Sequence, residues 1–129
     1  MKENRTILVV GDKPASRELV EAVLLGQGYN LAYADGDAAA LLSSGEVKPD
    51  LVLLMLGMPE VVRMCHRLRD EPSLAFTPLL VVAEADDRGG RLLVIEAGAD
   101  DLISEPLDAV ELRTRVNTMM RLNRYRRRV

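Results

Sequence analysis

The most constraining feature of this sequence is an unbroken apolar run, Leu51–Leu56, with turn-forming residues on both sides. Lys48-Pro49 precedes the run, and Gly57 and Pro59 follow it. A short apolar run without alternation predicts a strand that is buried on both faces, as in a parallel sheet covered by helices. Such sheets carry their chemistry beyond the carboxyl ends of the strands. Met55 stands at that end, although its thioether neither attacks phosphorus as an anion nor binds a hard metal ion.

Strand-like and helix-like segments alternate five times along the chain. Strands are expected at Thr6–Val10, Asn30–Ala34, Leu51–Leu56, Pro78–Val82 and Asp101–Ser104. Helices are expected from Pro14 until Gly26 and Gly28 stop the first, then at Ala38–Leu42, Glu60–Leu68, Leu92–Ala97 and Val110 to about Tyr125. Residues 86–90 are expected to form a loop, with Asp86 or Asp87 as a helix cap, and Asp108 is expected to cap the last helix. The alternation predicts an α/β fold, with a parallel sheet and helices on both of its faces.

Composition excludes several classes of function. The 129 residues suffice for one domain, but only 3% are aromatic, so the stacking platforms of single-strand nucleic-acid binders are absent. No apolar run approaches the roughly 18 residues of a membrane span. The single cysteine excludes an internal disulfide and favours a reducing compartment. We therefore expect a cytoplasmic protein without direct contact to membrane or nucleic acid.

Six short motifs follow one another over nearly the whole chain: Ile7-Leu8-Val9-Val10 with Asp12, Pro49-Asp50-Leu51-Val52-Leu53-Leu54, Met58-Pro59, Cys65-His66-Arg67-Leu68-Arg69, Thr77-Pro78-Leu79-Leu80-Val81-Val82, and Glu96-Ala97-Gly98-Ala99-Asp100-Asp101. In this order and at this spacing they resemble the receiver domain of two-component response regulators, the CheY-like family. The resemblance implies a flavodoxin-like (βα)5 three-layer sandwich with strand order 2-1-3-4-5. Glu105-Pro106 stands where the family has Lys-Pro, whose peptide bond is often cis, so a cis bond is expected here.

The same resemblance implies a phosphorylation pocket, and this chain departs from it at nearly every position. The family uses an Asp after the third strand, two acids that hold Mg²⁺ after the first, a Ser or Thr after the fourth and a Lys after the fifth. The residues at those positions, in chain order, are Gly11, Asp12, Met55, Ala83 and Glu105. At the position of the family's aromatic switch residue, in the fifth strand, this chain has Leu102. These departures predict a degenerate pocket without a nucleophile.

We therefore interpret the chain as a non-phosphorylatable pseudo-receiver of a two-component or phosphorelay system, not an enzyme, that acts by protein contacts or dimerisation. The family forms its dimers through the fourth helix, fifth strand and fifth helix, so the candidate surface residues are Leu92, Leu93, Leu102, Val110 and Leu112. No cofactor is expected. Mg²⁺ binding should be weak or absent, with Asp12, beside Glu105, as the weak candidate ligand.

Two alternatives remain open. The first is a conventional phospho-accepting regulator that uses a displaced acid such as Asp12. The second is a flavodoxin-like protein that binds a small ligand, although Gly11-Asp12-Lys13-Pro14 is too short for a phosphate loop and carries an acid there. Cys65 falls on an apolar helix face and is expected in the core, and the single histidine, His66, lacks the partners of a metal site or triad.

Charge is distributed unevenly. Five of the 17 basic residues and none of the 20 acidic residues lie within residues 121–128, so the net charge of −3 leaves −8 on residues 1–120. Such a basic run could contact nucleic acid or an acidic membrane. We favour a receiver domain at 1–120 and a basic helical connector at 121–129 that leads to an output domain.

Overall fold

The computed structural model describes residues 5–11, 14–34, 45, 47–84 and 88–128. Its strands are β1 Thr6–Val10, β2 Asn30–Ala34, β3 Leu51–Leu54, β4 Leu79–Ala83 and β5 Asp101–Ser104. Its helices are α1 Pro14–Gly26, α3 Glu60–Asp70, α4 Arg88–Glu96 and α5 Ala109–Arg128, with a short 3-10 helix, η1, at Pro72–Leu74. The helix predicted at Ala38–Leu42 and the cap predicted at Asp86 or Asp87 lie outside the described residues.

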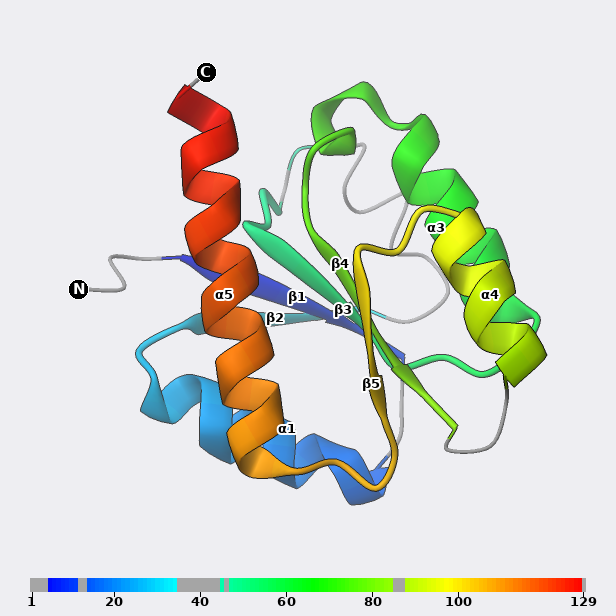
Figure 1. The fold of residues 1–129 in the computed structure, drawn as a ribbon. Coiled ribbons are helices and arrows are strands. Elements are labelled where there is room, and N and C mark those ends of the chain that lie inside the picture. The colour runs from blue at the N-terminus through cyan, green and yellow to red at the C-terminus, as the bar shows by residue number, and fades with distance from the viewer. Residues whose placement is uncertain (1–4, 12–13, 35–44, 46, 85–87, 129) are drawn as a thin grey trace.

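The five strands form one parallel sheet in the order β2-β1-β3-β4-β5, which confirms the expected architecture and strand order. β1 lies between β2 and β3: Leu8 pairs with Ala32 of β2 on one side and with Val52 of β3 on the other. Because every strand runs in the same direction, the carboxyl ends of all five lie at one edge of the sheet (Figure 1). This edge is where the sequence predicts the degenerate pocket.

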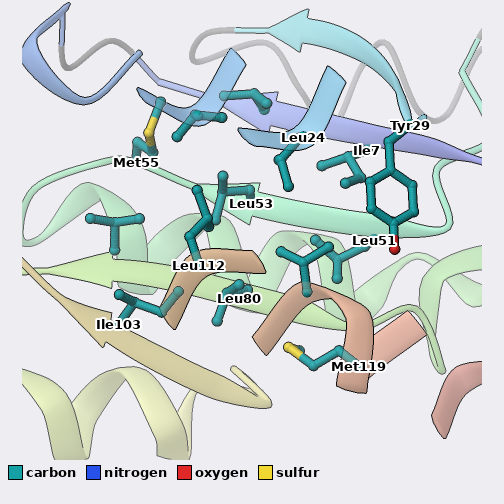
Figure 2. Packing of buried hydrophobic residues seen from close by; sticks show 14 of the residues in the cluster. Ile7, Leu24, Tyr29, Leu51, Leu53, Met55, Leu80, Ile103, Leu112 and Met119 are labelled. Carbon is teal, nitrogen blue, oxygen red and sulfur yellow. The ribbon is translucent and has the colours of Figure 1, made fainter. Parts of the chain in front are cut away.

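Helices cover the two faces of the sheet in pairs (Figure 1). α3 and α4 pack on the face that carries Leu8, Val52 and Val81, whereas α1 and α5 pack on the face that carries Ile7 and Leu53 (Figure 2). Adjacent residues of a strand point to opposite faces, so a strand covered on both sides needs apolar residues at every position. All four residues of β3 are accordingly buried.

Several predicted boundaries were wrong, and tertiary packing explains the largest error. β3 ends at Leu54, two residues earlier than predicted, and β4 begins and ends one residue later. α4 includes Gly89 and Gly90, which were expected in a loop because glycine is a poor helix former. Gly90 is buried at the contact of α4 with the rest of the fold, so packing outweighs its low helix propensity. The predicted cap of α5 is confirmed, since an Asp108 carboxylate oxygen accepts a hydrogen bond from the Glu111 amide at 2.9 Å.

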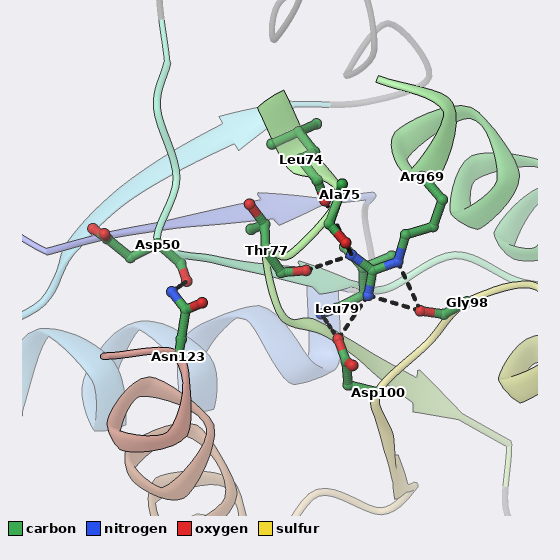
Figure 3. A network of polar contacts seen from close by, with 9 residues as sticks. All are labelled: Asp50, Arg69, Leu74, Ala75, Thr77, Leu79, Gly98, Asp100 and Asn123. Atoms are coloured by element: carbon green, nitrogen blue, oxygen red, sulfur yellow. Dashed lines mark hydrogen bonds and ion pairs between the residues drawn. The ribbon is translucent and has the colours of Figure 1, made fainter. Parts of the chain in front are cut away.

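Arg69, near the end of α3, links segments at the edge of the sheet where the strands begin, opposite the edge of the predicted pocket (Figure 3). Its Nε and Nη2 donate to the carbonyl oxygen of Gly98 at 3.0 and 2.8 Å, and Nη2 also contacts Asp100 Oδ2 at 2.7 Å. Its Nη1 donates to three carbonyl oxygens of the connection between η1 and β4, the shortest bond being 2.7 Å to Thr77. Asp100 Oδ2 in turn accepts the Leu79 amide at 2.8 Å. One guanidinium thus joins α3 to the segments that start β4 and β5.

Candidate functional site

Main-chain hydrogen bonds bring the predicted pocket positions to the carboxyl edge of the sheet. The Met55 amide donates to the Val10 carbonyl at 2.7 Å, immediately before Gly11. The Glu105 amide donates to the Ala83 carbonyl at 2.8 Å. Residue 83 therefore ends its strand, and residues 11, 55 and 105 directly follow theirs, so the four positions lie at the carboxyl ends of adjacent strands. Asp12, the remaining acidic member, lies outside the described residues.

Met55 has the position after β3 and is only 1% exposed. Its side chain belongs to the apolar cluster between the sheet and the helices α1 and α5 (Figure 2). A flexible thioether fills irregular space in a core well, and here it is part of that core. This residue can neither accept nor transfer a phosphoryl group.

Gly11 has a main-chain conformation that other residues rarely adopt, with φ at 101°. A Cβ at this position would overlap the main-chain carbonyl oxygen of Met55 and would approach Cδ2 of Leu56 at 2.8 Å. A carboxylate at position 11 therefore needs a shift of the main chain after β3. Gly11 is therefore more than an acidic position that has lost its side chain. The surrounding main chain leaves no space for any side chain at this position.

The other two described positions also lack the groups that hold a phosphoryl oxygen. Ala83 has a methyl group where a hydroxyl would donate a hydrogen bond, and it is partly buried. Glu105, also partly buried, brings an acid to the position at which a cation would meet an anion. The Glu105-Pro106 peptide bond is cis, as expected, and so is the Met58-Pro59 bond. Leu102, the switch position, lies in β5 and packs against the core cluster beneath α3 and α4.

Within the described ranges, no three His, Cys, Asp or Glu side chains come together as a metal site would require. Because Asp12 is outside those ranges, the expected weakness of Mg²⁺ binding stays a prediction. Cys65 is buried in the α3 core, as predicted. No helix among the described residues is both long enough and apolar enough to cross a membrane.

A cavity of about 280 Å³ opens at the same edge, between α3 and α4, and sequence reasoning missed it. Its lining is mainly apolar and includes Leu56, Met58 and Val61, with Glu84 and Arg91 as its charged members. The lining residues come from four separate elements, so no local sequence pattern identifies it.

Of the five residues predicted for a contact surface, three are well exposed, and the contact itself stays a prediction. Leu92, Leu93 and Val110 are 66%, 51% and 58% exposed. The prediction that Leu112 belongs to this surface was wrong, because Leu112 is fully buried. It lies on the inner face of α5 with Val116, Met119 and Met120, whereas Val110 lies on the outer face. Leu102 is half-buried. Ile95 and Leu122, 44% and 51% exposed, extend the apolar surface of α4 and α5 and were not predicted.

Comparison with known proteins gives concordant matches. The family model described as "Response regulator receiver domain" matches residues 7–117. The chain is 34% identical over 117 residues to the response regulator PleD of Caulobacter vibrioides, a match that covers 89% of this chain and 26% of PleD. It is 34% identical over 119 residues to the DNA-binding response regulator MtrA of Mycolicibacterium smegmatis, with 91% of this chain and 51% of MtrA covered. A solved structure of a response regulator protein from Burkholderia multivorans has 31% identity and a TM-score of 0.71, covering 90% of this chain and 94% of that one.

Proposed function

This chain belongs to the response regulator receiver domain family of two-component signalling, and from that premise we propose that it is a pseudo-receiver. In this proposal the receiver fold is kept, phosphoryl transfer is lost, and signalling takes place through contacts with other proteins.

The observation that carries the proposal is the replacement of the nucleophile by a core residue. Met55, at the position of the phospho-accepting aspartate, is 1% exposed and packs beneath α1 and α5. Phosphoryl transfer depends on a positioned nucleophile and on the metal ions and donors that neutralise the transferring group. Gly11, Ala83 and Glu105 supply neither the first acid, nor the hydroxyl, nor the lysine.

Glu105 adds an unfavourable charge to this deficit. A carboxylate opposes the approach of an anionic phosphodonor, whereas the family's lysine attracts it. All four described pocket positions are therefore unfavourable for phosphoryl transfer. Restoring one of them leaves the other three unsuited to a phosphoryl group.

Contacts with a partner are supported by the apolar side chains that α4 and α5 expose. Leu92, Leu93 and Ile95 lie within four residues of α4, and each is at least 44% exposed. Contiguous exposed apolar side chains are a feature of interaction surfaces, and these three residues on one helix support a contact there. Whether the partner is a second copy or another protein is decided by sedimentation at high concentration: a monomer that binds no other signalling protein contradicts this part of the proposal.

We also propose that residues 1–120 are the receiver and residues 121–129 are a basic connector to an output domain, in the cytoplasm. The family match ends at residue 117, whereas α5 continues to Arg128. The chain spans about a quarter of PleD and about half of MtrA, so both relatives extend well beyond a receiver.

The first experiment is an amide NMR titration of the purified chain with Mg²⁺ alone and then with beryllofluoride, an analogue of the phosphoryl group. We expect no saturable shifts at Gly11, Met55, Ala83 or Glu105. In parallel, incubation with acetyl phosphate and Mg²⁺ should leave the intact mass unchanged. A receiver that accepts phosphate under the same conditions is the positive control.

Saturable shifts clustered at those four residues, or a phosphorylated peptide mapped to this edge, contradict the loss of phosphoryl transfer. A shift near Asp12 with a mass gain would identify a displaced acceptor instead.

A further inference from the structure

The buried part of the cavity between α3 and α4 is formed by three valines from three different elements. They are Val61 of α3, Val81 of β4 and Val94 of α4, and each is at most 2% exposed. A branched Cβ restricts valine to few rotamers, so these side chains do not turn into the space between them. The inner part of the cavity is therefore apolar and preformed.

The size of the cavity limits what it can hold. An apolar cavity of about 150 Å³ accepts a benzene molecule, whereas sites for drug-sized ligands begin at roughly 300 Å³. This cavity, at about 280 Å³, has room for one branched aliphatic or aromatic group and a small polar head. A nucleotide or a helix of a partner protein is too large for it.

Two side chains of opposite charge, Glu84 and Arg91, complete the lining. Glu84 directly follows β4 and is exposed, whereas Arg91 lies in the first turn of α4 and is half-buried. In the part of the chain that the structure describes, neither of them makes an ion pair, with the other or with a third residue. A guanidinium and a carboxylate that line one small cavity without pairing can each bind an opposite charge on the same ligand.

The segment between β3 and α3 leaves the cavity open to solvent. A Cβ at Gly57 would meet no atom within 4 Å, and Met58 is 40% exposed. Both residues belong to the lining. Because a thioether side chain is flexible, Met58 can move aside for a ligand and then cover it.

We propose that this cavity binds a free α-amino acid whose apolar side chain has the size of that of leucine or phenylalanine. The ligand's side chain lies among the three valines. Its carboxylate accepts hydrogen bonds from the Arg91 guanidinium, and its ammonium group donates to the Glu84 carboxylate. A ligand with only one of these charges leaves either Glu84 or Arg91 without a counterion.

The inference goes beyond the proposed function and does not depend on it. Ala83, which replaces the hydroxyl of the family's pocket, also lines the cavity. A bound amino acid would therefore act at the same edge of the sheet at which a phosphoryl group acts in other receivers.

The test is an amide NMR titration of the complete chain with L-leucine and with L-phenylalanine. We expect at least one of them to shift the amides of residues 56–58, 81–84 and 90–94 saturably. Half-saturation should lie at or below about 1 mM, since a ligand with so few atoms binds weakly.

Three compounds separate the parts of the ligand. 4-Methylpentanoate is leucine without its ammonium group, 3-methylbutylamine is leucine without its carboxylate, and glycine has no side chain. Each should bind about tenfold more weakly than leucine or not at all, because each loses one of the three contacts.

Two pairs of variants connect binding to these charges. Arg91→Gln should weaken binding about tenfold, whereas Arg63→Gln, at an exposed site of α3 outside the cavity, should leave the affinity within about twofold. Glu84→Gln should weaken binding several-fold because its carboxylate is exposed, and Glu96→Gln, outside the cavity on α4, is its matched control. All four substitutions should leave the melting temperature close to that of the parent chain.

The assignment is overturned if neither amino acid gives saturable shifts, or if the shifts lie away from the cavity. It is also overturned if 4-methylpentanoate, 3-methylbutylamine or glycine binds as tightly as leucine, or if Arg91→Gln and Arg63→Gln have equal effects. A chain that binds no amino acid and gains no mass from acetyl phosphate overturns this inference while leaving the pseudo-receiver proposal intact.

Discussion

The main-chain carbonyl oxygen of Met55 lies where the Cβ of any larger residue at position 11 would have to be, and Gly11 meets it with a positive φ of 101°. The two positions are therefore structurally coupled. The chain after β3 approaches the end of β1 closely because residue 11 has no side chain. An acid at position 11 and this course of the main chain at Met55 are incompatible.

Gly11→Ala should destabilise the fold by about 1–3 kcal/mol, because it adds both a clash and a backbone conformation unfavourable to L residues. Gly26→Ala is the matched control, since a Cβ there meets nothing within 4 Å at the end of α1. That change should be neutral or stabilise by about 0.5–1 kcal/mol. Urea denaturation measures both. If the two variants prove equally stable, the close approach of Met55 is not restrictive.

Met55→Asp should not restore phosphorylation by acetyl phosphate, because the first Mg²⁺-binding acid, the hydroxyl and the lysine are still missing. It should also cost about 2–5 kcal/mol, since a carboxylate replaces a buried apolar side chain. Met55→Leu, which keeps the volume and the apolar character, should cost less than about 1.5 kcal/mol. Denaturation curves and intact mass give the two results. Phosphorylation of the Met55→Asp variant would show that the pocket lacks only its nucleophile.

Arg69→Ala should destabilise the fold by about 2–4 kcal/mol, because several carbonyl oxygens and Asp100 lose their donor at once. Arg67→Ala, at an exposed site of the same helix, should stay within about 0.5 kcal/mol of the parent chain. Arg69→Lys should recover only part of the loss, since an ammonium group lacks the planar fork that reaches both Gly98 and Thr77. A loss as small as that of Arg67→Ala would mean that this network is dispensable.

Burial raises the pKa of the Cys65 thiol to about 11, from an ordinary 9.0. The unfolded chain therefore releases the thiol proton about two pH units earlier than the folded chain. Between pH 9 and 11, this group should lower the free energy of unfolding by up to about 1.4 kcal/mol per unit as pH rises, while below pH 9 its contribution is constant.

The comparison with Cys65→Ala isolates this effect from other groups that titrate in the same range. The difference in stability between the parent chain and the variant should shrink as pH rises through that window. A difference independent of pH would contradict the raised pKa. The native thiol should also react with a disulfide reagent at pH 8 only as fast as the chain unfolds.

Local patterns were sufficient wherever a residue's role depends on its neighbours in sequence. The runs around Leu8, Leu53 and Val81 predict strands buried on both faces, and their alternation with helices predicts a parallel sheet. The pocket positions were also assigned without a structure, because the resemblance to receiver domains places each of them near the end of a strand. Helix boundaries were less certain: Gly89 and Gly90 belong to α4 despite their low propensity.

The sequence alone determined the layered fold, because that depends on hydrophobic period. Its resemblance to receiver domains also placed Met55, and not an aspartate, after the third strand, because that assignment depends on residue type and on the order of the motifs. Only the tertiary structure decided that Leu112 is core whereas Val110 is surface, that Met55 leaves no space for a side chain at Gly11, and that Arg69 joins α3 to Thr77 and Gly98. These three relationships join segments far apart in the chain. They depend on distances of a few ångströms after packing, which periodicity and residue type do not encode.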